Sequence, residues 1–166
     1  SLHQFWLFII RLIVFMTEQE SIQYLNIGVE SAPIQTHLGI IQNVIQRMAA
    51  NSSACKAWCV TLVSAILVIV ADKGKPDFTY IAFLPTVVFL ALDAYYLSLE
   101  KAFRQSYNDF IKKLHESKLT QEDLYSVVPK GNLSSLQIQS LKSFSVWGFY
   151  ISIVVLIYIT KIIAIG

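Results

Sequence analysis

The sequence has few charged residues and few cysteines. Only 14% of its 166 residues are charged, against about 25% in a typical soluble domain. Cys55 and Cys59 are its two cysteines, too few for a disulfide framework. They share one face of a predicted helix, but no further cysteine or well-spaced histidine completes a metal site, so we expect no bound metal. A net charge of +2 does not indicate a nucleic-acid-binding protein.

Sequence motifs for catalysis are also absent. The chain contains no G-x-S-x-G, no phosphate-binding glycine loop and no H-E-x-x-H. His3, His37 and His115 are scattered, which argues against an active site built on histidine. We therefore expect a protein that is not an enzyme and that uses no cofactor.

Three long apolar stretches dominate the sequence instead: Ala57–Ala71, Phe78–Leu97 and Val146–Thr160. Each carries at most one charge over about the length, roughly 20 residues, that a helix needs to cross a bilayer. The hydrophobic content of 55% and the mean hydropathy of +0.55 agree. The sequence therefore predicts an all-α polytopic membrane protein with transmembrane helices at about residues 53–71, 78–97 and 144–163.

Residues 1–16 admit two interpretations. Phe5–Phe15 is apolar but short, and Arg11 interrupts it. Met16 begins a run that resembles an ordinary bacterial start, so the residues before it would be an N-terminal extension. The alternative is a short interfacial segment or a fourth membrane helix. Residues 17–166 are predicted to form a single membrane domain.

Amphipathic helices are predicted next to the spans. Apolar residues recur at helical spacing over residues 34–52, and nothing between Thr36 and Ala71 demands a break. One long helix should therefore include both the amphipathic segment and the first span. The second span should likewise continue into a helix over residues 98–117, and Pro85 is expected to kink that span.

The helix predicted over residues 98–117 has an apolar stripe that includes Tyr107–Leu114. Its solvated face contains two pairs of opposite charge at i,i+4 spacing, Glu100–Arg104 and Asp109–Lys113. We expect both pairs to form.

A third helix is predicted over residues 121–143. Thr120 and Asp123 form a capping-box pattern at its start, and Pro129–Asn132 reads as a turn. From Leu133 to Ile163 nothing is expected to interrupt the approach to the third span.

Lysine and arginine are distributed unevenly along the predicted topology. On one side of the spans lie Arg47, Lys56, Lys101, Arg104, Lys112, Lys113, Lys118, Lys130 and Lys142. The other side has Lys73, Lys75 and Lys161. The positive-inside rule places the first side in the cytoplasm. The amphipathic helices then form a cytosolic bundle below a bacterial inner membrane, in contact with its lipids.

Asp93 is the most informative single residue. A carboxylate inside a span is costly to maintain and is a functional candidate by default. The alternative is a position at headgroup depth, with hydrogen bonds to Tyr95, Tyr96 or an arginine such as Arg47. Both interpretations stay open from the sequence.

Small and hydroxyl-bearing residues lie within the spans. Thr61 and Ser64 share a face of the first span, and Gly148 and Ser152 form a small-xxx-small pair in the third. Such residues allow close helix packing. The hydroxyls of Thr61, Ser64 and Ser152 would line a narrow water path if helices from several subunits converged.

Gln35, Gln42 and Gln46 project in a row from the helix predicted over residues 34–52. In a symmetric oligomer this row would line a cytoplasmic vestibule. A solvated polar helix face is the simpler alternative.

Arg47, Lys56 and Arg104 form a third candidate group. Together they could attract an anion, such as a nucleotide phosphate or a lipid headgroup. Basic residues beside membrane helices also serve topology and lipid contact, and that alternative stays open.

The segment from Arg47 to Val63, with Phe89–Arg104 downstream, resembles a group of small bacterial membrane proteins. Some of these are similar to effectors of anti-phage defence, namely Hailong, membrane-effector CBASS and certain retrons. The resemblance covers about residues 34–105, with a polar signature of Arg47, Asn51, Lys56, Asp93, Glu100 and Arg104. It implies an oligomeric pore that depolarises the infected cell under the control of a cytosolic sensor protein or a nucleotide signal.

Two hypotheses of different classes follow. The first is an ion-conducting effector that assembles as a homo-oligomer, a tetramer or larger ring, and opens through its cytosolic helices. The second is a non-conducting membrane scaffold that recruits a soluble partner through the Tyr107–Leu114 stripe.

Overall fold

The computed structural model describes Arg11 and residues 30–165, and every regular element among them is helical. The predicted all-α class is confirmed for this part of the chain. The two interpretations of residues 1–16 concern a segment that lies, apart from Arg11, outside the described residues. The elements after residue 30 are α2 (Ala32–Lys73), η1 (Pro76–Ala82), α3 (Phe83–His115), η2 (Gln121–Asp123), α4 (Leu133–Leu141) and α5 (Phe144–Ile165).

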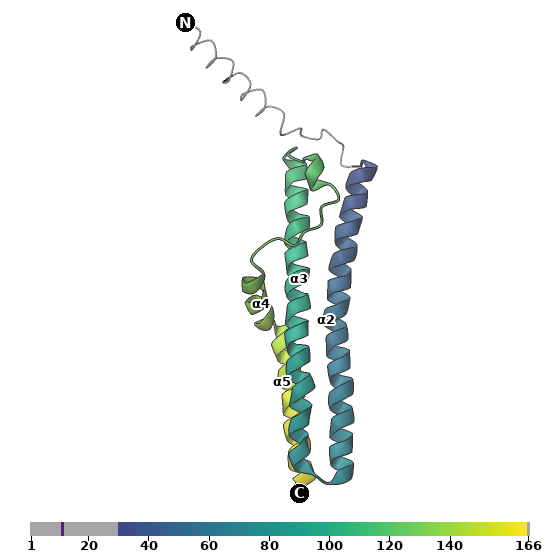
Figure 1. The fold of residues 1–166 in the computed structure, drawn as a ribbon, viewed down its shortest axis with the longest axis vertical. Coiled ribbons are helices and arrows are strands. Elements are labelled where there is room, and N and C mark those ends of the chain that lie inside the picture. The colour runs from purple at the N-terminus through teal and green to yellow at the C-terminus, as the bar shows by residue number, and fades with distance from the viewer. Residues whose placement is uncertain (1–10, 12–29, 166) are drawn as a thin grey trace.

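Helix α2 is a single uninterrupted helix of 42 residues, as the sequence predicts. It runs beside α3 over the full height of the molecule (Figure 1). Pro33 lies in its first turn, where a missing N–H costs no hydrogen bond. Gly74 ends it with φ of 59°, a left-handed conformation that favours glycine, and its N–H bonds to the carbonyl of Ala71.

Pro85 does not kink the second span. A 3₁₀ segment, η1, follows the turn after α2, and α3 begins at Phe83. Pro85 is therefore the third residue of α3, in the first turn, where backbone N–H groups have no partner within an α-helix. The irregularity that this proline was expected to impose inside the span falls instead at the helix start.

The helix predicted over residues 121–143 is wrong. The capping box of Thr120 and Asp123 forms, but it starts only the three-residue turn η2. Residues 124–132 are non-helical, because Pro129 disfavours a helical residue before it and Gly131 has φ of 98°. We call residues 117–131, which connect α3 to α4, the strap.

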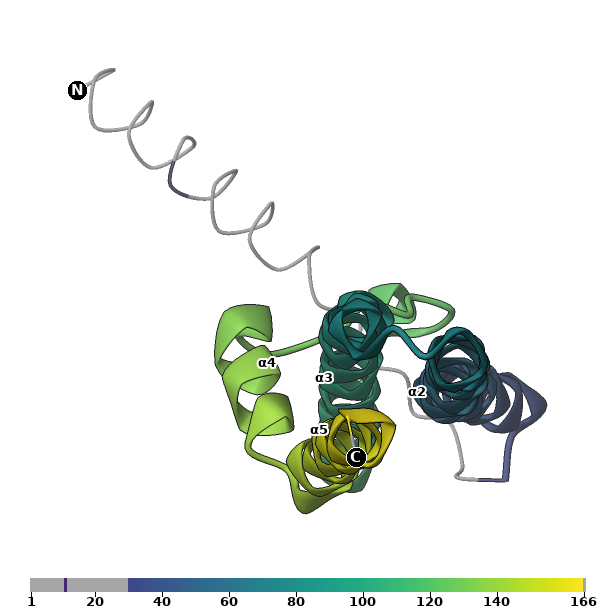
Figure 2. The same ribbon diagram turned by 90° about the horizontal axis from the view of Figure 1, so that it is seen from below.

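The third helical run is also divided. Helix α4 begins at Asn132, whose side chain accepts a hydrogen bond from the N–H of Ser135. It ends at Leu141, and a break at residues 142–143 separates it from α5. Figure 2 shows α4 beside α3, on the side away from α2. The predicted continuity from Leu133 to Ile163 is therefore wrong.

Three helices are long and apolar enough to cross a membrane: Ala32–Lys73, Pro76–His115 and Phe144–Ile163. Only 28%, 28% and 22% of the residues in their apolar windows are buried. Val68, Leu84 and Ile163, for example, are 68%, 69% and 73% exposed. Apolar surface costs about 25 cal/mol per Å² in water, so this exterior suits a lipid environment. By length and composition these helices are compatible with a membrane protein.

A helix of 42 residues is about 63 Å long at 1.5 Å per residue, twice the roughly 30 Å thickness of a hydrocarbon core. A bilayer would therefore cover only about half of α2. We call residues 53–97 and 144–165 the apolar half, which contains the membrane-spanning segments. Residues 30–52 and 98–143 form the polar half.

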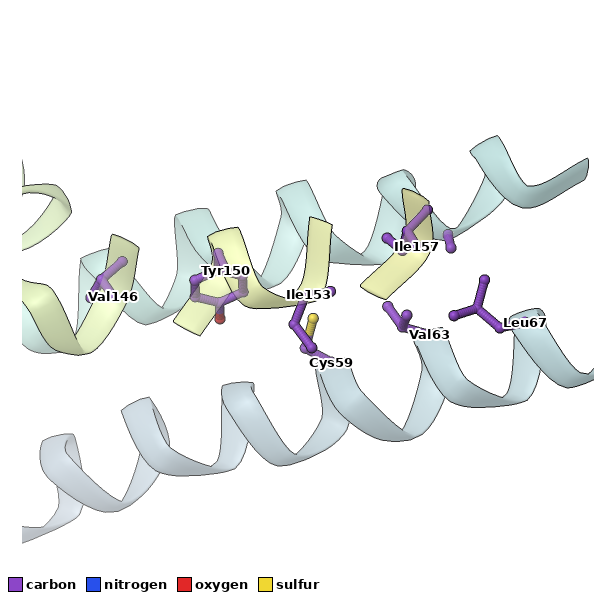
Figure 3. Close-up of a cluster of buried hydrophobic side chains, with 8 residues drawn as sticks. Cys59, Val63, Leu67, Val146, Tyr150, Ile153 and Ile157 are labelled. Atoms are coloured by element: carbon purple, nitrogen blue, oxygen red, sulfur yellow. The ribbon is translucent and has the colours of Figure 1, made fainter. Parts of the chain in front are cut away.

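The core of the apolar half joins α2 to α5. Cys59, Val63 and Leu67 recur every four residues on α2 and face Tyr150, Ile153 and Ile157 of α5 (Figure 3). The i,i+4 and i,i+3 spacings place each set on one helix face. In the polar half a smaller cluster forms where α2, α3 and the strap meet, from Ile34, Phe110, Leu114 and Leu119.

Candidate functional site

A buried ion pair joins α2 to α3 inside the apolar half. The Asp93 side chain is 0% exposed, and its Oδ2 lies 2.6 Å from Nζ of Lys56. The hydroxyl of Ser52 donates to Oδ1 of the same carboxylate. The partners expected for Asp93, namely Tyr95, Tyr96 or Arg47, are wrong, since Lys56 and Ser52 bind its carboxylate instead.

The spacing of α2 explains this pairing. Ser52 and Lys56 are one turn apart and belong to the same inward face as Met48, Cys55 and Cys59. From the sequence, the spacing of the buried residues on α2 could have identified Ser52 as an inward-facing residue. Its partner could not be found in this way, because the register between α2 and α3 depends on the turn that joins them.

Tyr150 brings α5 to the same place. Its side chain is only 3% exposed, and its hydroxyl is buried close enough to Asp93 to interact with its charge. This hydroxyl has no hydrogen bond of normal geometry within the described chain. All three spanning helices therefore meet at the Asp93 carboxylate, which makes this cluster of Ser52, Lys56, Asp93 and Tyr150 the polar centre of the apolar half.

A polar groove of about 360 Å³ separates α2 from α3 in the polar half. That volume lies within the range of small-molecule sites, about 300–1,000 Å³. Nε2 of Gln42 donates to the Tyr107 hydroxyl across the groove at 3.4 Å. The lining residues are Gln42, Ile45, Gln46, Arg104, Tyr107 and Asn108.

The groove contains some, but not all, of the predicted site residues. Gln42, Gln46 and Arg104 meet there, whereas Gln35 is exposed elsewhere on α2. Nη2 of Arg104 lies 2.8 Å from Oε1 of Glu100, which confirms the predicted i,i+4 pair. That pairing occupies the guanidinium, so an incoming anion would have to displace Glu100.

The predicted anion site of Arg47, Lys56 and Arg104 does not form. Lys56 points inward to Asp93, Arg104 lines the groove, and Arg47 is exposed outside both sites. Three cations on two long helices converge only if they lie on the facing sides of the helices and at the same height along them. Arg47, Lys56 and Arg104 do not. In the part of the chain that the structure describes, no group of three His, Cys, Asp or Glu side chains could hold a metal ion.

Thr61 and Ser64 lie on a face of α2 that neither α3 nor α5 covers. Both are exposed, as are Ala50, Ala54 and Ala57, which precede them at intervals of three or four on the same helix. The same spacing continues through Val68, which is 68% exposed, to Ala71. The Thr61 hydroxyl donates to the carbonyl of Ala57 at 2.9 Å. We call this surface the small-residue face of α2.

Gly148 and Ser152 do not pack against another helix of the chain. Ser152 is exposed and donates to the carbonyl of Gly148 at 2.9 Å. The nearest atoms around Gly148 belong to the Phe144 ring of its own helix. Helix α5 packs instead through the opposite set, Val146, Tyr150, Ile153 and Ile157.

Unlike the Glu100–Arg104 pair, the second predicted surface pair, Asp109 with Lys113, is replaced by other partners. Lys130 of the strap binds Asp109, and Lys113 binds Asp123 at 2.7 Å. The hydrogen bond from Lys130 lowers the pKa of the Asp109 carboxyl. Burial raises the pKa of Asp123, but hydrogen bonds from Lys113 and Thr120 outweigh this effect and leave it below its usual value. A local i,i+4 rule could not anticipate partners from the strap.

No family model, no curated protein and no solved structure matches the chain.

Proposed function

We propose that this chain is one subunit of a homo-oligomeric, ion-conducting pore in the bacterial inner membrane, with no catalytic activity of its own. In this proposal the pore is the effector of an anti-phage system and depolarises the infected cell. The observation that supports it best is the small-residue face of α2, which crosses the apolar half without cover from α3 or α5.

That face has the composition of a helix-helix contact near an axis. Alanine, serine and threonine let neighbouring backbones approach closely in a membrane. Thr61 and Ser64 add hydroxyl groups that can hydrogen-bond to water in a narrow path. Three helices of one chain cannot enclose such a path, so copies of α2 must be brought together by symmetry, in a tetramer or a larger ring.

The Ser52–Lys56–Asp93–Tyr150 cluster suits the closed state of such a pore. Its ion pair is buried, so it resists separation of α2 from α3 as long as both charges remain paired. An opening movement that changes the register of these helices must break or rearrange this pair. The free energy needed to open the proposed pore would therefore depend on this cluster.

The groove lined by Gln42, Gln46 and Arg104 is the proposed site for an activating signal. Amide and phenol groups can hydrogen-bond to the polar edges of a nucleobase, and Arg104 can bind a phosphate once it leaves Glu100. A nucleotide or oligonucleotide signal, or a cytosolic sensor protein, would open the pore only if it bound the open packing more tightly. Because α2 and α3 are unbroken between groove and span, movement at one reaches the other.

The scaffold alternative lacks the surface it requires. It depends on an exposed Tyr107–Leu114 stripe, but Phe110 and Leu114 are 5% and 9% exposed and pack against Ile34 and Leu119. The stripe holds the strap and α2 within the same chain, so no specific observation favours recruitment of a soluble partner there.

Two experiments test the proposal at separate levels. Cysteine substitutions at Thr61 and at Ser152, in a background without Cys55 and Cys59, compare α2 with α5 as the subunit contact. We expect oxidation to link copies of the Thr61→Cys variant and to leave the Ser152→Cys variant monomeric on a denaturing gel. The reverse result would place α5 at the axis.

Ion flux is measured with a membrane-potential dye after induced expression, with the co-expressed defence partners where these are required. Replacing Thr61 and Ser64 by leucine should reduce depolarisation at least tenfold, and Ser152→Leu should preserve it. Equal protein levels in the membrane are the control. Normal membrane potential with the unsubstituted chain in an activated system would contradict the pore.

A further inference from the structure

The strap is attached to both long helices of the polar half. On the α3 side, the Ser106 hydroxyl donates to the carbonyl of Val128 at 2.6 Å, and the N–H of Lys130 donates to the carbonyl of Ala102 at 3.3 Å. On the α2 side, the backbone N–H of Tyr125 donates to Nδ1 of His37 at 2.8 Å. The strap thus links α2 to α3 through the imidazole ring of His37, in addition to the apolar cluster in which Leu119 packs with Ile34.

His37 can accept this bond in only one protonation state. Its side chain is 1% exposed and its ring lies 4.3 Å from the Phe110 ring. Because Nδ1 accepts a hydrogen bond, it holds no proton, and the neutral ring has its proton on Nε2. Protonation of Nδ1 would place an N–H opposite the N–H of Tyr125, and the bond would be lost.

Tyr125 adds to the sensitivity of this contact. Its φ is 64°, in the left-handed region that residues with a side chain rarely adopt. Such a conformation persists only while the surrounding contacts impose it. When the bond to His37 is removed, the backbone at Tyr125 is free to relax away from α2.

Protons can reach His37 from solvent. A cavity of about 70 Å³ lies beside the ring, large enough for water. The charged groups around it are Asp109 and Lys113 of α3, Asp123 of η2 and Lys130 of the strap. They form two ion pairs, so their charges largely cancel. Burial lowers the pKa of His37, and the negative charge of Asp123 opposes that effect.

We propose that His37 makes the strap a pH-sensitive clasp: protonation of its ring in an acidified cytosol releases the strap from α2. Loss of this hydrogen bond would remove one of the contacts that hold the polar ends of α2 and α3 together, alongside the apolar cluster of Ile34, Phe110 and Leu114. If the proposed pore admits protons, acidification would then act back on its own cytosolic half. This last link rests on the proposed function, whereas release of the strap does not.

Amide hydrogen exchange on the full-length protein in lipid nanodiscs tests the clasp without requiring any ion flux. Exchange of peptides from residues 117–131 is compared at pH 7.5 and about pH 5, after correction for the intrinsic pH dependence of exchange. We expect protection at Tyr125 to fall at least tenfold at the lower pH. Unchanged protection would overturn the proposal, whatever the outcome of the flux measurements.

Two variants assign the effect to the ring. In His37→Asn the amide oxygen takes the place of Nδ1 and accepts the same bond but does not titrate, so protection should persist at low pH. His115→Asn removes an exposed histidine at the end of α3 and should respond like the unsubstituted chain. Loss of protection in His37→Asn with acid would show that another group is responsible. Should His37→Asn fold poorly, the unsubstituted chain at the two pH values still decides whether the strap responds, and His115→Asn decides whether His115 is the source.

Discussion

In the apolar half, α2 contacts α5 through an apolar cluster and α3 through the buried Lys56–Asp93 pair, and most of the remaining surface is left to lipid. In the polar half, α2 and α3 enclose a polar groove and are joined by a non-helical strap. The spanning contacts are buried from water and the strap contacts lie beside it. The apolar half is therefore suited to maintain a single packing of its helices, and the polar half is suited to respond to solutes.

The largest effect is expected from Asp93→Ala. This substitution removes the charge that pairs with the Lys56 ammonium, whose side chain is 20% exposed and whose Nζ retains a 3.4 Å hydrogen bond to Ser52. Loss of one member of a buried pair typically costs about 3–5 kcal/mol. Unfolding of the purified protein in mixed micelles measures it. The double variant Asp93→Leu with Lys56→Met should recover most of that loss, because a well-packed apolar pair can replace a buried ion pair. A loss below about 1 kcal/mol in the single variant would place Asp93 in contact with water.

Removal of one buried isoleucine from each half compares their packing directly. Ile41 of the polar half and Ile157 of the apolar half are both 1% exposed. Ile41→Ala should cost about 2–5 kcal/mol, since water is the unfolded-state solvent there. Ile157→Ala should cost less, because lipid solvates isoleucine as well as the protein core does and only packing contacts are lost. Equal losses would indicate that Ile157 is solvated by water in the unfolded state.

Acid should destabilise the polar half selectively. The pKa of His37 in the folded protein is below its usual value of 6.5, so the unfolded state binds more protons as the pH falls. The stabilisation by neutral His37 is therefore complete above about pH 6.5 and declines as the pH falls toward the folded-state pKa. Unfolding measured at several pH values should show this decline in the His115→Asn control and not in His37→Asn. The same slope in both variants would exclude His37 as its source.

Ser106→Ala should have a smaller effect. It removes the 2.6 Å hydrogen bond from α3 to the Val128 carbonyl, worth about 0.5–1.5 kcal/mol. The loss should appear as faster hydrogen exchange within residues 117–131 and not in the spans. Faster exchange across α2 and α3 as well would mean that the strap supports the whole polar half.

The smallest effect is expected for Arg104→Gln. The Arg104 side chain is 61% exposed, and a solvent-exposed ion pair contributes about 0–1 kcal/mol. Stability should therefore stay nearly constant, and any loss of response to an activating signal would report ligand binding in the groove. A large loss of stability would assign Arg104 a structural role instead.

The spacing of apolar residues correctly predicted features that depend on a single helix, such as the continuity of α2 and its exposed face. The unbroken α2 followed from its uninterrupted spacing, and the exposure of Thr61 could be anticipated from the phase of Val63 and Cys59. The pairing of Lys56 with Asp93 could not, because it depends on the register between two helices. The strap was missed in part: a turn was predicted at Pro129–Asn132, but residues 124–128 were expected to be helical because Thr120 and Asp123 do form a capping box. His37 lacked any local pattern, since its partner is 88 residues away.

Because α2 is unbroken, its rotation about its own axis determines which of its side chains face the axis of the proposed pore. Successive residues of an α-helix are about 100° apart around its axis. Beside Thr61 on the helix surface lie Val60 and Leu62, which are 41% and 43% exposed. Rotation of α2 by about a quarter of a turn would therefore exchange a hydroxyl lining for an aliphatic one. Ser52 and Lys56, held by Asp93, fix the angle from which such a rotation would start.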